Sequence, residues 1–161
     1  IVDNSVSQWV DVLTRDLTGI TNTSYADWSN KIYVGGSSAV YAGHSAGGNS
    51  SIQLRTDNNN SGVVSTTSGG KVSKVQITWN INTTADRKVQ IYGSNTAYSS
   101  AADLYDDGKK GTLLTTITYS TKGEAQTDTY AVSGDYKYIG IRSSSKALYI
   151  DEIQITWVAG N

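Results

Sequence analysis

The sequence predicts an all-β fold, an antiparallel β-sandwich that is jelly-roll-like, formed as a single domain over residues 1–161. Three observations lead to this prediction. Short runs in which apolar and polar residues alternate recur along the chain, as they do in the strands of a sandwich or barrel. The aliphatic residues are mostly Val and Ile and the aromatic residues are Tyr and Trp, all of which favour strands. Gly, Asn, Asp and Ser separate the runs, and these residues favour turns.

Each predicted strand rests on an alternation of period two, which places every second side chain on one face of a sheet. The alternation is clear in five segments and weaker in five others. The clear strands, in chain order, are Ile52–Leu54, Val75–Ile81, Val89–Ile91, Tyr138–Ile141 and Ile153–Trp157. The weaker strands are Trp9–Leu13, Ala39–Tyr41, Val63–Thr66, Leu113–Tyr119 and Thr127–Val132. Only Ala97–Tyr105 is compatible with a helical turn.

Two of these strands have almost the same sequence. Lys74–Trp79 reads Lys-Val-Gln-Ile-Thr-Trp and Glu152–Trp157 reads Glu-Ile-Gln-Ile-Thr-Trp. Equivalent strands of a sandwich meet equivalent environments, and we favour this explanation over a true internal duplication. Both tryptophans, Trp79 and Trp157, share the inward phase of their strands and are therefore assigned to the core.

The totals exclude several partners. The net charge is −1 and there is no basic run, so we expect no nucleic acid to bind. No apolar stretch approaches the roughly 20 residues of a membrane span, so we expect no membrane insertion. The absence of Cys excludes disulfides. The chain begins at Ile1 instead of Met, and we expect a secreted or cell-surface segment of a parent protein with other domains.

One string resembles a catalytic motif. Gly43–Gly47 reads Gly-His-Ser-Ala-Gly, the G-x-S-x-G pattern of the nucleophile elbow in α/β-hydrolases. That elbow needs a strand, a turn and a helix, with a later histidine as base. His44 is the only histidine and occupies the x position, while the residues that follow favour loop and strand. The carboxylates lie mostly in predicted turns, without the flanking pair that a glycosidase needs. We therefore predict that the chain is not an enzyme.

A cluster of hard oxygen ligands suggests calcium more weakly. Asp103, Asp106 and Asp107 precede Gly108, but they lack the regular ligand spacing of an EF-hand. Lys109 and Lys110 follow and add repulsive charge. A plain turn is the favoured interpretation, so no cofactor is expected, and a structural calcium ion at these aspartates is the alternative.

A ligand site is predicted on an exposed sheet face. If the apolar residues of the alternating strands point inward, their neighbours form a face of planar amides, guanidinium groups and aromatic rings. Such groups suit the hydroxyls and apolar faces of sugars. The predicted ligand-binding residues on this face are Gln53, Arg55, Gln90, Tyr92, Tyr138 and Arg142. Trp28, in the irregular segment between Tyr25 and Tyr33, is a second candidate as an exposed stacking platform, although it is equally suited to fill one end of the sandwich.

The chain also resembles a known kind of module. The resemblance is carried by residues 37–49, 52–55, 71–79, 89–98, 103–105 and 134–142, and by the closing Ile-Gln-Ile-Thr-Trp157. In these segments it resembles a β-sandwich accessory module found on secreted proteins and polysaccharide-active enzymes of gut bacteria. The resemblance implies a module outside the cell, and it brings no agreed set of binding residues.

Together these observations favour a non-catalytic, lectin-like carbohydrate-binding module that targets a polysaccharide or glycan. The alternative is a structural or adhesive surface module, such as a self-associating fibre unit. The three sequon-like strings at Asn22, Asn49 and Asn82 leave open that the surface itself carries glycans.

Overall fold

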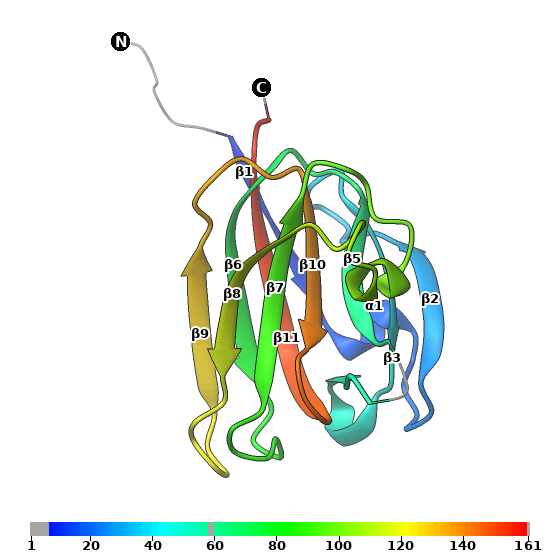
Figure 1. The fold of residues 1–161 in the computed structure, drawn as a ribbon, viewed down its shortest axis with the longest axis vertical. Helices are drawn as coiled ribbons and strands as arrows, with labels where there is room; N and C mark the ends of the chain where they lie inside the picture. The colour runs from blue at the N-terminus through cyan, green and yellow to red at the C-terminus, as the bar shows by residue number, and fades with distance from the viewer. Residues whose placement is uncertain (1–6, 58–59, 161) are drawn as a thin grey trace.

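The computed structural model of the chain describes residues 7–57 and 60–160. Two antiparallel sheets pack face to face and enclose a common core, which confirms the predicted all-β sandwich (Figure 1). Among the described residues, no helix is long and apolar enough to span a membrane.

The first sheet has the strand order β1-β11-β6-β9, and the short strand β4 pairs with one end of β11. Its strands are β1 (Gln8–Leu13), β11 (Leu148–Val158), β6 (Lys71–Trp79), β9 (Gln126–Ala131) and β4 (Ile52–Leu54). The second sheet has the order β2-β3-β5-β10-β7-β8. Its strands are β2 (Ala26–Lys31), β3 (Val40–Ser45), β5 (Gly62–Thr67), β10 (Tyr138–Ser143), β7 (Lys88–Ser94) and β8 (Thr112–Thr118). Within the described part of the chain, three short helices join the strands: α1 (Arg15–Thr18), η1 (Gly48–Ser50) and η2 (Ala101–Tyr105).

Every strand predicted from alternation overlaps a strand of the structure, and η2 lies within the predicted helical turn. The prediction missed β2, whose sequence Ala-Asp-Trp-Ser-Asn-Lys does not alternate. This strand buries Trp28 alone and bulges where it pairs with β3, with Asn30 at a positive φ of 57°. A bulge breaks the period of two on which the prediction depended.

The two strands of nearly identical sequence lie side by side. In the first sheet β6 pairs with β11, and Ile77 lies directly opposite Ile153. Trp79 and Trp157 are fully buried, as predicted. The repeated sequence therefore belongs to neighbouring strands whose inward side chains fill the same core.

One buried carboxylate ties the two sheets together. Asp11 on β1 accepts hydrogen bonds from the Tyr41 hydroxyl (2.6 Å) and from the Ser37 backbone N–H (2.7 Å). The Trp157 indole N–H in turn donates to the Tyr41 oxygen (2.9 Å). Burial, followed by the charge of Asp11, raises the pKa of Tyr41 far above its usual value. Asp11 lies in an inward position of β1, where the pattern gave no reason to expect a charge.

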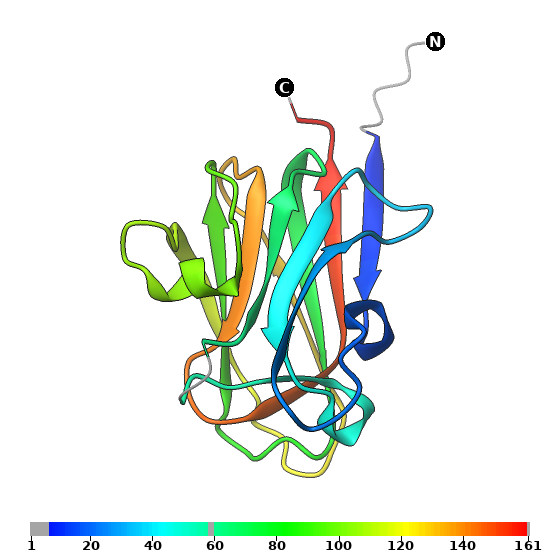
Figure 2. The same cartoon turned by 90° about the vertical axis from the view of Figure 1, so that its right-hand side faces the viewer.

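The outer face of the second sheet carries a second, smaller core. Its buried members come from β3, β5, β7 and the segment 95–111: Ala42, Val64, Tyr92, Tyr98 and Leu104. The segment 95–111, which contains η2, lies on the outside of the sandwich, on the side away from β1 and β11 (Figure 2). This segment covers part of the face that the sequence predicted to be open.

Candidate functional site

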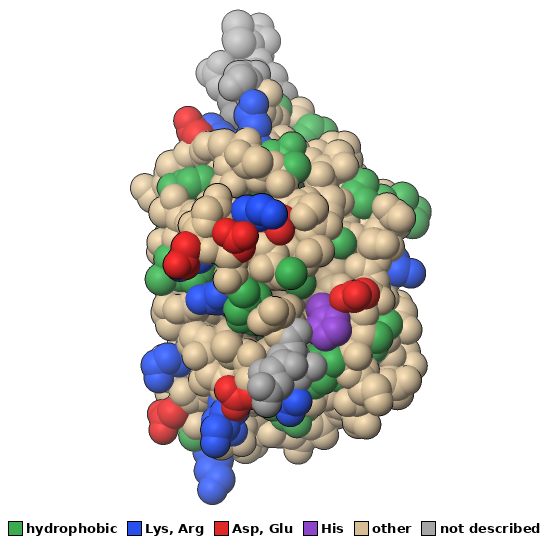
Figure 3. Space-filling model, turned by 45° about the vertical axis from the view of Figure 1, so that its right-hand side comes forward, with side chains coloured by type: hydrophobic (Ala, Val, Ile, Leu, Met, Phe, Trp, Pro, Cys, Tyr) green, Lys and Arg blue, Asp and Glu red, His purple; other side chains and the backbone are tan. Residues whose placement is uncertain are grey.

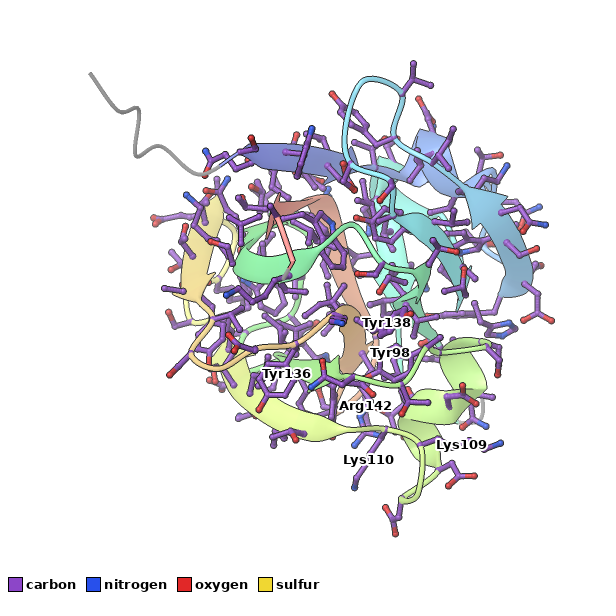
Figure 4. The ribbon with its side chains drawn as sticks, turned by 90° about the horizontal axis from the view of Figure 1, so that it is seen from above. Tyr98, Lys109, Lys110, Tyr136, Tyr138 and Arg142 are labelled. Carbon is purple, nitrogen blue, oxygen red and sulfur yellow. The ribbon has the colours of Figure 1, made fainter. Side chains whose placement is uncertain are left out.

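Arg142 holds the segment 95–111 against the sheet. It points outward from β10, and its guanidinium carbon lies 5.0 Å from the ring centre of Tyr92 and 4.9 Å from that of Tyr105. Its Nη1 donates to the Leu104 carbonyl (2.5 Å) and its Nε to Gln90 Oε1 (3.1 Å). Figure 4 shows Arg142 gathered with Tyr98 and Tyr138 by β10, with Lys109 and Lys110 beyond them. The Arg142 side chain is thus engaged by the protein itself.

The structure corrects the predicted surroundings of Tyr92. The expectation of an exposed ring is wrong, because Tyr92 is 2% exposed beneath the segment 95–111. Gln90 is half-buried and accepts from both Arg142 and the Tyr92 hydroxyl. Tyr138 packs against the edge of the same cluster. Four of the predicted site residues therefore come together, as a clasp for η2. Ligand binding by Gln90, Tyr138 and Arg142 stays a prediction.

The other two residues predicted for that face lie elsewhere. Gln53 is on β4, in the first sheet, and its Oε1 accepts from the Gly48 backbone N–H (3.0 Å). Arg55 follows β4 and lies over the ring of Tyr25, with its guanidinium carbon 5.2 Å from the ring centre. Gln53 lies beside the same tyrosine without forming a hydrogen bond of good geometry to it. Binding by these two residues also stays a prediction.

The prediction that Trp28 lies exposed on a loop is wrong. Trp28 lies in β2 and is 6% exposed, and its indole N–H donates to Ser45 Oγ (2.9 Å). Its ring packs under Gly43, where an added Cβ would come within 2.4 Å of it. The alternative interpretation, in which Trp28 fills the sandwich, is the observed one.

Beside the segment 95–111, the same outer face opens into a pocket of about 440 Å³. Its lining residues come from β2, β3, Asn60 and the start of the η2 segment: Asp27, Trp28, Ser29, Ala42, Gly43, His44, Asn60, Ser99, Ser100 and Ala102. His44 reaches the surface here, as Figure 3 shows in purple. We call this cavity the His44 pocket.

Strand pairing builds the polar centre of the His44 pocket. Asp27 on β2 lies directly opposite His44 on β3, so both side chains emerge on the same face. His44 Nδ1 lies 2.7 Å from Asp27 Oδ1. An aspartate that accepts from Nδ1 fixes the tautomer of the imidazole and leaves Nε2 free to accept. The pair is therefore oriented without help from a ligand.

An aromatic ring and a cation back this pair. The ring of Tyr25 stacks on His44 with centres 6.1 Å apart and planes inclined by 24°. Arg55 lies against Tyr25, as described above. Burial raises the pKa of Tyr25 to about 12, although the Arg55 charge acts in the opposite direction. Asp27, His44, Tyr25 and Arg55 thus form one row of touching side chains, which we call the stacked row.

The structure also shows that the G-x-S-x-G string at residues 43–47 does not form a nucleophile elbow. Residues 43–45 lie within β3, with neither a turn nor a helix after the serine at the place an elbow requires. Ser45 is fully buried and accepts from Trp28, whereas His44 points to the opposite face. The serine and the histidine cannot act on a common substrate.

The three aspartates suggested for calcium each have a different partner. Asp103 Oδ2 accepts from the backbone N–H and the hydroxyl of Ser99 (2.8 and 2.9 Å). Asp106 Oδ1 accepts from the Gly108 N–H (2.8 Å), and Asp107 pairs with Lys110 (2.9 Å), which lowers the pKa of Asp107. Among residues 7–57 and 60–160, no three carboxylate or imidazole groups converge. Calcium binding here stays a prediction.

Chemically, the His44 pocket presents hydrogen-bonding groups on a small-residue floor. Sequence reasoning considered His44 only as part of a failed catalytic motif and did not single out Asp27 or Tyr25. The sequence did contain a signal: Asp27 directly precedes the buried Trp28, and His44 directly precedes the buried Ser45. Because neighbouring residues of a strand point to opposite faces, both Asp27 and His44 point outward. Only the pairing of β2 with β3 places the two side chains together, and β2 was not predicted.

No protein-family model matches the chain, and no curated protein matches its sequence. Among solved structures, the K3 adhesin domain of Lys-gingipain from Porphyromonas gingivalis is 12% identical, with 91% of each chain covered and a TM-score of 0.45. A truncated AlyQ with CBM32 and alginate lyase domains is 15% identical (TM-score 0.47), covering 86% of this chain and 35% of that one. The family 32 carbohydrate-binding module of C. perfringens NanJ, in complex with galactose, is 16% identical (TM-score 0.41), covering 83% and 92%. At these TM-scores and identities the likenesses assign neither a family nor a ligand to this chain.

Proposed function

We propose that this chain is a non-catalytic carbohydrate-binding module and that a polysaccharide or glycan binds in the His44 pocket. One observation carries the proposal: six of the ten lining residues offer hydroxyl, amide, imidazole or carboxylate groups, around a volume of about 440 Å³. Small-molecule pockets typically have ~300–1,000 Å³. Most such pockets are lined mainly by apolar side chains, whereas more than half of the residues that line this one are polar. A polar lining suits a ligand that is itself covered in hydroxyls.

The same geometry supports binding over catalysis. Glycoside hydrolysis needs two carboxylates on opposite sides of the scissile bond. Asp27 is the only carboxylate among the described residues that line the pocket. One oxygen of Asp27 is already engaged by His44. The pair can orient a hydroxyl, but it lacks the second carboxyl group for acid and base roles.

A module of this kind would act by localisation. Polysaccharides and glycoconjugates lie mostly outside the cytoplasm, so the proposed role is that of a secreted or cell-surface module. Attached to other domains of a parent protein, it would hold them near the polysaccharide and raise their effective concentration there.

A glycan array, followed by affinity electrophoresis in gels that contain the best polysaccharide, tests the proposal. We expect binding by the full chain, weakened by at least about tenfold in His44→Ala, because loss of a ligand hydrogen bond costs about 1.4 kcal/mol. Thr129→Ala, an exposed change on β9, is the matched control and should bind as the parent does. Absence of binding to every glycan, or binding that His44→Ala leaves unchanged, would overturn the proposal.

A second candidate function, self-association in an adhesive module, is favoured by one observation. Four apolar side chains are exposed on β1 and on the loop that follows β2: Trp9, Val10, Ile32 and Val34. The loop and the strand are linked by the hydrogen bond from Ser37 to Asp11. Sedimentation velocity over a range of concentrations separates the candidates. If the parent chain and Val34→Lys are both monomeric, self-association is contradicted. If the parent chain forms a dimer and Val34→Lys is monomeric, self-association is supported.

A further inference from the structure

The His44 pocket offers mainly hydrogen-bond acceptors. Asp27 Oδ2 has no partner among the described residues, and the Asp27 side chain is 93% exposed. His44 Nε2 is free to accept, since Nδ1 faces the carboxylate. The Ser99 hydroxyl donates to Asp103 and can still accept, whereas the Ser100 hydroxyl and the Asn60 amide can each donate or accept. The fixed acceptors at the centre thus call for a ligand that brings O–H donors.

The charge of the pocket points in the same direction. Among the described residues that line it, none is Lys or Arg. The guanidinium of Arg55 lies against Tyr25 behind His44, and Arg55 is not among the lining residues. Recognition of a carboxylate or sulfate relies on charge-assisted hydrogen bonds from such cations. An anionic sugar would instead bring its charge beside Asp27.

We infer that the His44 pocket selects uncharged sugars, whose hydroxyls donate to Asp27 and His44, and excludes uronates and sulfated sugars. This inference rests on the proposed carbohydrate-binding function and names its ligand class. The pair acts as a charge filter: the same carboxylate that accepts from a neutral diol repels an acidic residue. Because Asp27 is exposed, the dielectric around it is close to that of water, and the repulsion between like charges about 4 Å apart amounts to roughly a fivefold change in affinity at low salt.

The test compares neutral and acidic probes. The panel contains mannan, galactan, glucomannan and β-glucan as uncharged probes, and polygalacturonate, alginate and heparin as anionic ones. The tightest uncharged ligand is then oxidised at its primary hydroxyls to carboxylates, which changes charge while keeping the backbone. We expect about a fivefold loss of affinity on oxidation at low salt, and a change of less than about twofold for the neutral ligand between low and high salt.

Two variants locate the effect. Asp27→Asn removes the charge at nearly constant size, so it should weaken the neutral ligand and shrink the penalty for the oxidised one to about twofold or less. Asp86→Asn is the matched control, because Asp86 is an exposed aspartate outside the pocket at a positive φ that Asn tolerates. Thermal unfolding of both variants confirms that each is folded.

The outcomes separate this inference from the proposed function. Equal or tighter binding of the anionic probes, weakened by His44→Ala, overturns charge selection while the carbohydrate-binding function stands. A penalty on oxidation that Asp27→Asn leaves unchanged also overturns it. Failure to bind any probe overturns both. The inference is supported if the chain binds a neutral probe, loses affinity when that probe is oxidised, and this loss shrinks in Asp27→Asn but persists in Asp86→Asn.

Discussion

The outer face of the second sheet contains two polar regions that differ in one respect, namely whether the chain covers them. Around Arg142, the segment 95–111 lies across the sheet, and the guanidinium donates to both the side-chain oxygen of Gln90 and the Leu104 carbonyl. Around His44, no such segment covers Asp27, and the lining hydroxyls face a pocket. Arginine beside tyrosine was the stronger sequence signal for binding, but in this fold that combination fastens a loop.

The largest effect that would break this comparison is on stability at Arg142. Arg142→Ala removes two ring contacts and leaves the Leu104 carbonyl unpaired, so we expect a loss of about 3 kcal/mol in unfolding free energy. Arg55→Ala is the matched control from the other region, where one ring contact is lost, with an expected cost of about 1 kcal/mol. Urea unfolding measures both. Equal costs would mean that Arg142 is no clasp.

The next largest effect is expected at a glycine of β10 that lets the segment 95–111 pack closely on the sheet. Gly140 lies beneath η2, and a Cβ there would come within 2.4 Å of Leu104 Cδ2. Gly140→Ala should therefore push the segment 95–111 outward, at a cost of about 2 kcal/mol from overpacking. Limited proteolysis within the segment should accelerate. A cleavage rate equal to that of the parent chain would show that Leu104 gives way without moving the segment.

Alkaline titration distinguishes the regions by their tyrosines. Burial raises the pKa of Tyr98 and Tyr105 in the covered region, and that of Tyr25 beside the pocket to about 12. Unfolded tyrosine ionises near pH 10, so above that pH the unfolded state releases protons that the folded state keeps. Stability is thus complete below pH 10 and falls as pH rises toward the folded pKa values, by up to ~1.4 kcal/mol per pH unit for a fully buried tyrosine and less for half-buried Tyr25.

The measurement is unfolding free energy between pH 9 and 12, with Tyr98→Phe as a comparison. This variant also loses the hydrogen bond to the Lys110 carbonyl (2.8 Å), a cost of about 1 kcal/mol at neutral pH. Its stability should decline less steeply above pH 10. Identical slopes would show that Tyr98 ionises freely in the folded chain.

The smallest expected effect is on stability at the pocket itself. Asp27→Ala removes the exposed partner of His44, which contributes less than about 0.5 kcal/mol, and His44→Ala also loses the stacking contact with Tyr25, for an expected total cost of about 1 kcal/mol. Calorimetric melting should place both close to the parent chain. A cost of several kcal/mol would make the pair a structural element and remove its distinction from the Arg142 clasp.

The strands of the sandwich were predictable because they obey local rules. Alternation located β6 and β11, and it placed Trp79 and Trp157 in the core without any knowledge of pairing. The binding residues were less predictable, since strand phase separates inward from outward but does not reveal what covers the outward side. Tyr92 has the outward phase that was expected, and it is buried by the cluster that it forms with residues of other strands and of the segment 95–111, such as Leu104.

The same limit explains why Asp27 and His44 went unnoticed as a pair. They are 17 positions apart, and their contact depends on the register between β3 and a bulged strand that does not alternate. Gln53 and Arg55 were assigned to a face shared with Arg142, although β4 belongs to the first sheet. Which strand belongs to which sheet is a property of topology, and a single sequence pattern does not contain it.

The pairing of β1 with β11 has a mechanical consequence. Gln8 lies opposite Val158 and Leu13 opposite Ile153, and the Ala159 N–H donates to the Ser7 carbonyl (3.3 Å). Tension applied through Ser7 and Gly160 would therefore separate the hydrogen bonds between these strands one after another, as in opening a zipper, instead of loading them all in shear. Such a module would yield at low force if pulled from both ends, which suits a part that positions its neighbours better than one that bears load in a fibre.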